Sequence, residues 1–298
     1  MTINKNPNQL YKSPIKPAPP AMPGLHYEIV PPKGLAQINL SELWRFRELL
    51  YIFIWRDIKV RYKQTLLGIV WAILQPLLTM VIFSLFFGRL MKIPSQGIPY
   101  PVFVYAGLLL WNYFYSALTD ISNSLIGNEN MIKKVYFPRI ILPIAQATTP
   151  AVDFVFAFIV LLGLMWFYHY SPHWLGLVAL PILLVMALGT ALGLGFFLAA
   201  LNAKYRDVRF ILPFFTQLLL FVTPVIYPLD IIPQRFQAIA MLNPLTGIIT
   251  MSRSLLLDLP LPPHWLRLLA ISVLVTTLLF IFGMTYFRKT ERFFADEL

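Results

Sequence analysis

The sequence predicts an all-α membrane protein with several transmembrane helices. Hydrophobic residues make up 58% of its 298 residues and charged residues only 12%, whereas a soluble domain carries about 25% charged residues. Between Arg139 and Lys204 the only Asp, Glu, Lys or Arg is Asp153, and other long stretches are nearly as apolar. A helix needs about 20 apolar residues to cross the hydrocarbon of a bilayer, so these stretches are expected to lie in one.

Six charge-poor intervals mark the expected spans. They cover about residues 66–90, 101–122, 140–168, 175–201, 210–227 and 266–287. The interval from Ile140 to Ala203 is too long for one helix, and the polar, proline-containing stretch 169–174 divides it. Pro76 lies inside the first span and is expected to kink it. An even number of spans places both termini on the same side of the membrane.

Residues 1–40 form a proline-rich tail without the apolar region of a secretory signal peptide. Such a density of proline favours an extended or disordered segment, expected in the cytosol. The expected domain division is therefore a tail of residues 1–40 and a membrane domain of residues 41–298.

The positive charges indicate the orientation. Nineteen Lys and Arg residues lie in segments 1–65, 126–139, 202–209 and 288–298, and five lie on the other side. The positive-inside rule then places both termini in the cytosol. The formal net charge of +11 thus follows membrane topology, and we expect no nucleic-acid partner.

Two segments are not expected to span. Residues 41–58 predict an amphipathic helix in the cytosolic interface, with Asn39 and Glu42 placed like a capping box. The segment from Pro228 to Pro263 is apolar but broken by prolines, which favours short re-entrant helices on the outer side. The apolar face of the first helix is formed by Leu43, Phe46, Leu50 and Phe53, opposite Arg45 and Glu48, with an aromatic flank of Trp44, Tyr51 and Trp55.

The sequence contains no recognisable catalytic or nucleotide-binding motif. It has no phosphate loop, no zinc-protease motif and no esterase motif, and it has no cysteine. We expect no metal site, because a proline and a turn separate His169 from His173. Asp120 and Asp153 are the carboxylates within the expected spans, and we interpret them as capping or paired groups near the interface. Energy for any transport would then come from another subunit.

Polar and aromatic residues gather in the first two spans, where rings could pack on sugars and amides could bond sugar hydroxyls. Packing between helices or contact with lipid would explain each one equally well. The residues expected to line a channel are Trp71, Gln75, Phe83, Trp111, Tyr115 and Tyr227.

Six motifs in order resemble the membrane subunits of type-2 ABC exporters, in the group that exports O-antigen, capsular polysaccharide and teichoic acid. The resemblance covers about residues 41–298. The motifs are DIKVRYKQTLLG at 57–68 followed by Trp71 and Gln75-Pro76-Leu77, NENMIKKVYFPR at 128–139, NAKYRDVR at 202–209, TPVIYP at 223–228, LNPL at 242–245 and ERFFAD at 291–296.

The resemblance implies a homodimer with two separate ABC ATPase subunits, which bind ATP and Mg²⁺, while this chain binds no cofactor. It implies an undecaprenyl-linked polysaccharide as substrate and a location in the bacterial cytoplasmic (inner) membrane. It assigns the interface or gate helix to Trp44, Arg47, Tyr51, Trp55, Arg56 and Asp57. It assigns ATPase coupling to Asn128, Glu129, Asn130, Met131, Lys133, Lys134 and Tyr136, although Lys133 and Lys134 could instead only enforce orientation.

The sequence therefore predicts a transport permease without enzymatic activity. Two alternatives stay open at this point. One is a type-2 ABC exporter of small hydrophobic compounds, and the other is a membrane enzyme acting on lipid-linked sugars, for which no carboxylate pair or nucleophile is apparent.

Overall fold

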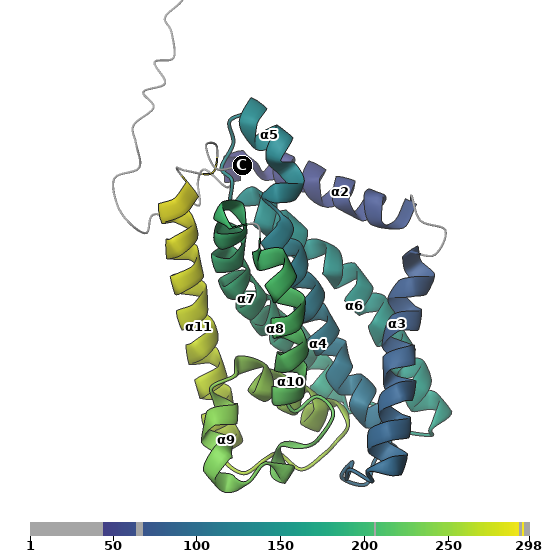
Figure 1. The fold of residues 1–298 in the computed structure, drawn as a ribbon. Coiled ribbons are helices and arrows are strands. Elements are labelled where there is room, and N and C mark those ends of the chain that lie inside the picture. The colour runs from purple at the N-terminus through teal and green to yellow at the C-terminus, as the bar shows by residue number, and fades with distance from the viewer. Residues whose placement is uncertain (1–43, 64–67, 206, 292–293, 295–298) are drawn as a thin grey trace, which may run out of the picture. The chain divides into compact units, whose positions relative to one another are not determined.

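The computed structural model describes residues 44–63, 68–205, 207–291 and 294 (Figure 1). These residues form helices and loops, and no strand occurs in these ranges. The expected proline-rich tail, Leu43 and the expected capping pair Asn39 and Glu42 lie outside them. The helices are α2 (Arg47–Lys63), α3 (Gly68–Phe83) with its π-helical continuation η2 (Ser84–Leu90), α4 (Tyr100–Asn123), η3 (Ile126–Asn128), α5 (Glu129–Lys134), α6 (Ile141–Phe167), α7 (Trp174–Lys204), α8 (Val208–Val222), η4 (Leu229–Ile231), α9 (Gln234–Met241), α10 (Pro244–Leu256) and α11 (Trp265–Thr290).

Five of these helices are long and apolar enough to cross a membrane: Val70–Leu90, Tyr100–Asn123, Ile141–Phe167, Trp174–Lys204 and Trp265–Thr290. They fall on five of the six expected spans, and the break between α6 and α7 falls at the expected residues 169–174. The helix at the other expected span, residues 210–227, is α8, which is apolar but only 15 residues long. At 1.5 Å per residue it is roughly 22 Å long, short of a bilayer core of about 30 Å. A count of six spans stays a prediction.

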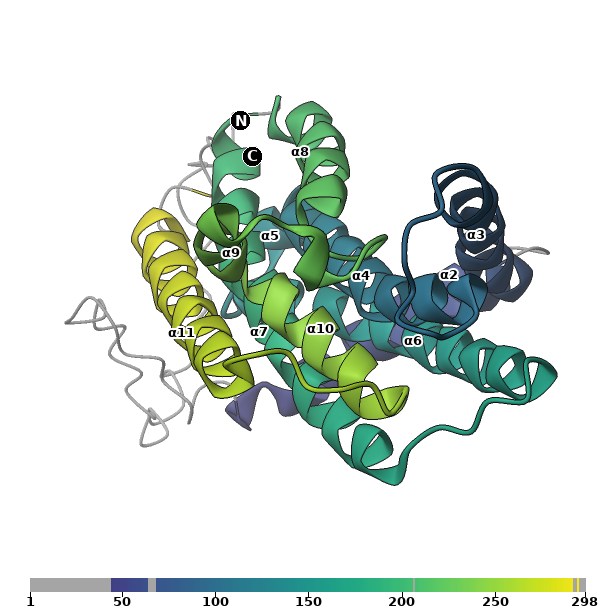
Figure 2. The same ribbon diagram turned by 90° about the horizontal axis from the view of Figure 1, so that it is seen from below.

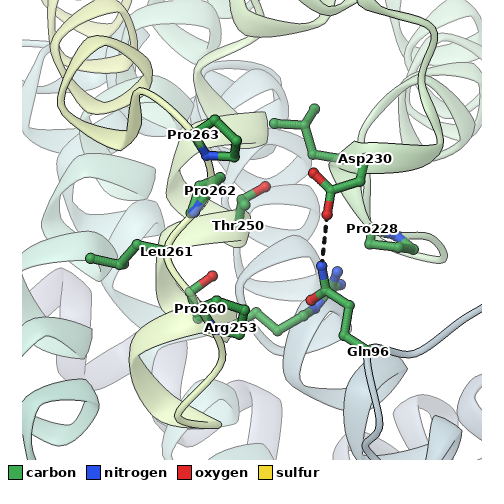
Figure 3. A pocket seen from close by; sticks show the side chains of 11 residues that line it. Gln96, Pro228, Asp230, Thr250, Arg253, Pro260, Leu261, Pro262 and Pro263 are labelled. Atoms are coloured by element: carbon green, nitrogen blue, oxygen red, sulfur yellow. Dashed lines mark hydrogen bonds between the residues drawn. The ribbon is translucent and has the colours of Figure 1, made fainter.

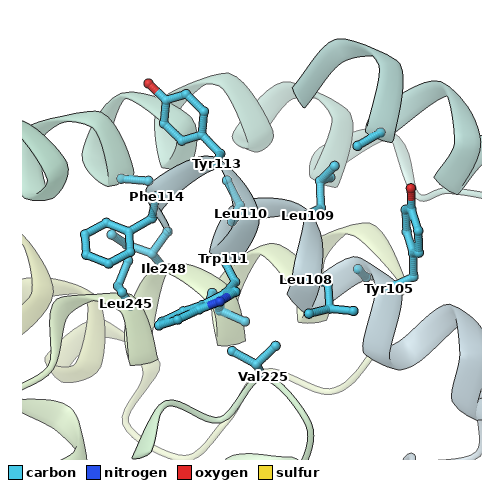
Figure 4. Packing of buried hydrophobic residues seen from close by; sticks show 14 of the residues in the cluster. Tyr105, Leu108, Leu109, Leu110, Trp111, Tyr113, Phe114, Val225, Leu245 and Ile248 are labelled. Carbon is cyan, nitrogen blue, oxygen red and sulfur yellow. The ribbon is translucent and has the colours of Figure 1, made fainter. Parts of the chain in front are cut away.

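Helix α4 forms the centre of the core. Most of its residues are buried, and it packs against α3, α6, α7 and α10, while its polar residues Asn112, Ser116 and Asp120 lie toward one side of the bundle. Figure 4 shows Trp111 and Phe114 of α4 beside Leu245 and Ile248 of α10. By contrast, α3 buries little of its surface and lies at the flank of the core (Figure 2).

Helices α7 and α11 approach closely through glycine. A Cβ added to Gly283 of α11 would overlap the backbone carbonyl of Gly193 in α7. The absence of two side chains therefore lets the two backbones touch, as small residues commonly do between membrane helices.

Helix α2 and the short helix α5 lie at one end of the bundle, called here the α5 end, and α9 lies at the other, called the α9 end (Figure 1). Phe53 of α2 is buried and stacks edge-on against Phe137, just beyond α5. Phe46 and Leu50 pack on the same cluster, as the expected apolar face required. The helix itself continues to Lys63, five residues beyond the expected end.

The broken segment between α8 and α11 forms η4, α9 and α10 at the α9 end. Asn243 begins α10 as its N-cap: its side chain accepts from the Leu245 amide at 3.1 Å and donates to Thr223 Oγ1 at 2.8 Å. Prolines separate these short helices as expected, while their re-entry into the membrane stays a prediction.

Candidate functional site

A pocket of about 390 Å³ lies between α3, α4 and α6. Trp71 and Gln75 line it from α3, and Asn112 and Tyr115 line it from α4. The walls therefore combine aromatic rings with two side-chain amides, which can pack on C–H faces and exchange hydrogen bonds with hydroxyl groups. The remaining lining residues are Arg61, Ala72, Pro76, Leu109, Tyr113, Ser116, Pro150, Asp153, Phe154 and Ala157.

One end of this pocket carries a charged cluster centred on Arg61, near the end of α2. Its guanidinium donates to Asp120 Oδ2 of α4 at 3.0 Å and to Asp153 Oδ2 of α6 at 2.6 Å. The same group contacts Ser116 Oγ at 3.2 Å. A single arginine thus joins α2, α4 and α6.

The cluster holds two carboxylates around that one guanidinium. The side chains of Arg61, Asp120 and Asp153 are 35%, 28% and 19% exposed, so water screens their charges only in part. Tyr62 also donates to Asp153 Oδ1 at 2.5 Å. Burial, and then the hydrogen bond to Asp153, raises the pKa of Tyr62, so its phenol stays a neutral donor at physiological pH.

Asp153 lies deeper than the sequence indicated. It was expected near a span end, but it is twelve residues into the 27-residue helix α6. Of the two expected roles, capping or paired, the contacts with Arg61 show that both carboxylates are paired.

A second polar contact fixes α2 against α6. Asp57 accepts from Gln146 Nε2 at 2.9 Å and from Arg56 Nε at 2.8 Å. The interface-helix residues Arg56 and Asp57 therefore lie on the side of α2 that faces the bundle.

The other predicted interface-helix residues are exposed, on α2 itself or, for Trp44, just before the helix begins. Trp44, Tyr51 and Trp55 are 70%, 64% and 48% exposed. Cationic groups lie over two of these rings, Arg47 over Trp44 at 5.3 Å and Lys59 over Trp55 at 5.0 Å. Exposed aromatic rings with cationic neighbours suit a membrane interface, and a gating role for them stays a prediction.

The predicted coupling residues form η3, α5 and the turn that follows. Asn128 is buried and its amide donates to the Ser124 carbonyl at 2.8 Å. Lys133 pairs with Glu129 at 2.6 Å along α5, and Tyr136 is 83% exposed. The segment is thus anchored at its start and presents charged and aromatic groups outward; Asn130, Met131 and Lys134 lie within the same helix.

The structure brings three of the six predicted channel residues together in the pocket: Trp71, Gln75 and Tyr115. The other three lie elsewhere. Phe83 packs against Phe87 farther along α3, and the Tyr227 hydroxyl donates to the Phe221 carbonyl at 2.8 Å beyond α8. Trp111 is 4% exposed and packs against Phe114 inside the core, so it reaches no surface of this chain.

Sequence reasoning did not assign Asn112 or the Arg61 cluster to the site. Arg61 and Tyr62 belong to the family-like motif at residues 57–68, but the sequence gives them no role of their own. No sequence spacing links Arg61 to Asp120 and Asp153, which are 59 and 92 residues away. The available signal was that two carboxylates in otherwise uncharged spans need a cationic partner.

The model of the family described as ABC-2 type transporter matches residues 48–257, which include the pocket and α5. The chain belongs to the ABC-2 type transporter family. Similar proteins cover most of its length. The O-antigen export system permease protein RfbA of Myxococcus xanthus is 30% identical over 257 residues, which is 85% of this chain and 97% of that protein.

Two further ABC-2 relatives carry related names. An O-antigen export system permease protein RfbA of Klebsiella pneumoniae is 29% identical over 260 residues, 87% of this chain and 97% of that protein. The polysialic acid transport protein KpsM of Escherichia coli is 28% identical over 205 residues, 66% and 77% of the two chains. As an ABC-2 family member with several apolar helices, the chain is a multi-pass membrane transporter and not an enzyme.

Proposed function

We propose that this chain is the permease subunit of an ATP-driven exporter of a lipid-linked polysaccharide. The similarity to permeases named for O-antigen export, over nearly their whole length, carries this proposal. The pocket is compatible with it, because its two amides can exchange hydrogen bonds with sugar hydroxyls and its aromatic rings can pack on C–H faces. Two copies would act together in the bacterial inner membrane, with both termini in the cytosol and an undecaprenyl-type lipid carrying the polymer.

Our proposed polymer path runs along the pocket wall formed by Trp71, Gln75 and Tyr115, between two copies of the chain. Helices α3 and α8 both contact α4 and expose apolar faces, which a second copy or lipid would cover. Trp111 is left out of this path because it is buried within one copy.

The chain contains no cysteine, so single cysteines test the path directly. A water-soluble thiol reagent is expected to label cysteines at 71, 75 and 115 in the assembled exporter, and bound polymer is expected to slow that labelling. A cysteine at 111 serves as the matched buried control and should stay unlabelled. Labelling of the three positions only by lipid-soluble reagents would place them on the outer surface and contradict the path.

ATP hydrolysis is proposed to occur on two separate ATPase subunits that also bind Mg²⁺, with α5 as their docking element. The chain carries no phosphate loop of its own. The purified chain should therefore hydrolyse ATP only after its partner is added. Robust hydrolysis of ATP by the chain alone would contradict the proposal that separate subunits carry the ATPase activity.

The docking proposal rests on the exposed charges and on Tyr136 at the α5 end. Exchanging Glu129 and Lys133 as Glu129→Lys with Lys133→Glu keeps an ion pair within α5 but reverses the charges offered to a partner. We expect the exchange to uncouple hydrolysis from export while membrane insertion continues. Normal coupling in the exchanged variant would refute docking through these charges.

A further inference from the structure

A second pocket, of about 360 Å³, lies at the α9 end (Figure 3). Its walls are α10, the segment around η4 and the proline-rich loop 260–263. The polar residues that line it are Gln96, Asp230, Thr250, Arg253 and Ser254. The pocket is separate from the one between α3, α4 and α6, and shares no lining residue with it.

The deep wall carries a buried cation. Arg253 is 4% exposed, and no ion pair to it occurs among the described residues. Its guanidinium donates to the Val225 carbonyl at 2.7 Å and reaches the Tyr227 carbonyl at 3.5 Å, and it lies 3.9 Å from the centre of the Phe103 ring. These contacts offset part of the cost of burying the charge, although no carboxylate in the described part of the chain pairs with it.

Two buried polar atoms of this wall also lack hydrogen-bond partners among the described residues: Arg253 Nε and Thr250 Oγ1. Figure 3 shows both side chains on the wall formed by α10. On the opposite side Gln96 donates to Asp230 at 2.9 Å, and Asp230 is exposed at the mouth. Buried polar groups without partners are uncommon in proteins, and a ligand that supplies the missing partners is one explanation.

We propose that this pocket binds one anionic sugar unit, an inference that rests on the proposed export of a polysaccharide. The sugar carboxylate would accept hydrogen bonds from the unused guanidinium N–H groups of Arg253, as arginine commonly binds carboxylates. A ring hydroxyl would pair with Thr250, and another would donate to Asp230 at the mouth. The proline rings of the loop 260–263 would cover the C–H face of the sugar. A pocket of this volume lies within the usual range for small-molecule sites.

The charge requirement is tested with galacturonate and galactose, two sugars that differ in a carboxylate. Their binding is measured by saturation-transfer NMR on the full-length chain in phosphatidylcholine nanodiscs, without ATP. Galacturonate should bind about tenfold tighter than galactose, because a hydrogen bond to a charged group contributes more than a neutral one. Arg253→Gln should remove that preference, because it removes the positive charge of the side chain.

Thr250→Val tests the pocket without disturbing the loop that Arg253 holds. It replaces the hydroxyl that lacks a partner by a methyl group of similar size and should weaken the binding of galacturonate about fivefold. Arg235→Gln is the matched control, since Arg235 is exposed on α9, outside the pocket. If Arg253→Gln does not fold, the effect of Thr250→Val on galacturonate binding tests the proposal by itself.

Equal affinity for the two sugars would overturn the proposal, and so would galacturonate binding that Thr250→Val leaves unchanged. The measurement involves no transport. Failure to export any polysaccharide would therefore refute the proposed function without altering the sugar-binding result, and loss of the sugar preference would leave the export proposal standing.

Discussion

Replacing Arg61 by glutamine is expected to loosen α2 from the bundle, because two carboxylates lose the cation that they share. Surface ion pairs contribute about 0–1 kcal/mol, whereas breaking a buried pair costs about 3–5 kcal/mol. The three side chains are 19–35% exposed, between those limits. After discounting for solvent screening, we expect Arg61→Gln to lower the free energy of unfolding by about 2 kcal/mol.

A double-mutant cycle isolates the contact itself. Arg61→Gln, Asp153→Asn and their combination should give a coupling free energy of about 1 kcal/mol, measured by reversible denaturant unfolding in mixed micelles. The combined variant should be more stable than the sum of the single losses predicts, because Asp153 then carries no charge that lacks a cation, and only Asp120 has lost its partner.

The matched control is the cycle of Glu129→Gln and Lys133→Gln in α5. That pair is exposed, with side chains 36% and 43% accessible, and such pairs along a helix contribute about 0.2–0.5 kcal/mol. A coupling for Arg61 and Asp153 no larger than this control would refute the view that the charged cluster fixes α2.

Three further predictions concern packing and capping. Gly283→Ala should destabilise the protein by about 1–3 kcal/mol because of the overlap with α7, measured by thermal unfolding in detergent, while Gly163→Ala, which meets nothing within 4 Å, should have little effect. Asn243→Ala should cost about 1 kcal/mol in the same measurement through loss of the α10 cap, and an unchanged midpoint would contradict that role. Tyr62→Phe should cost about 1 kcal/mol, equally at pH 6 and pH 9, because the raised pKa keeps the phenol neutral throughout; a loss confined to one pH would contradict this.

The helical architecture could be predicted from the sequence because it depends on local composition. The lengths of the apolar intervals and the polar break at residues 169–174 placed five long helices, and the spacing of Phe46, Leu50 and Phe53 identified the inner face of α2. The length of α8 was less predictable, since apolar composition continues past Val222 while the helix ends there.

The site was predictable only in part, because it depends on contacts between distant segments. Aromatic and amide content pointed to α3 and α4, two of the helices that form the pocket, but nothing in the sequence distinguishes Tyr115, which lines the pocket, from Trp111, which faces the core one turn earlier. The partners of Arg61 also required the fold, since α2 crosses α6 and brings the guanidinium to a carboxylate in the middle of that helix.

The glycine contact between α7 and α11 limits how this protein can change shape. Where two backbones touch without intervening side chains, sliding one helix past the other brings carbonyls and bulkier neighbours into collision. We therefore expect α7 and α11 to move together as one unit. Helix α3, at the opposite flank and with the smallest buried share of the five long helices, is free of that constraint. Helix α3 contacts the rest of the bundle mainly through α4 and α6. We therefore expect α3 to shift relative to α7 and α11 more readily than α2, which Arg61 and Asp57 hold against α4 and α6.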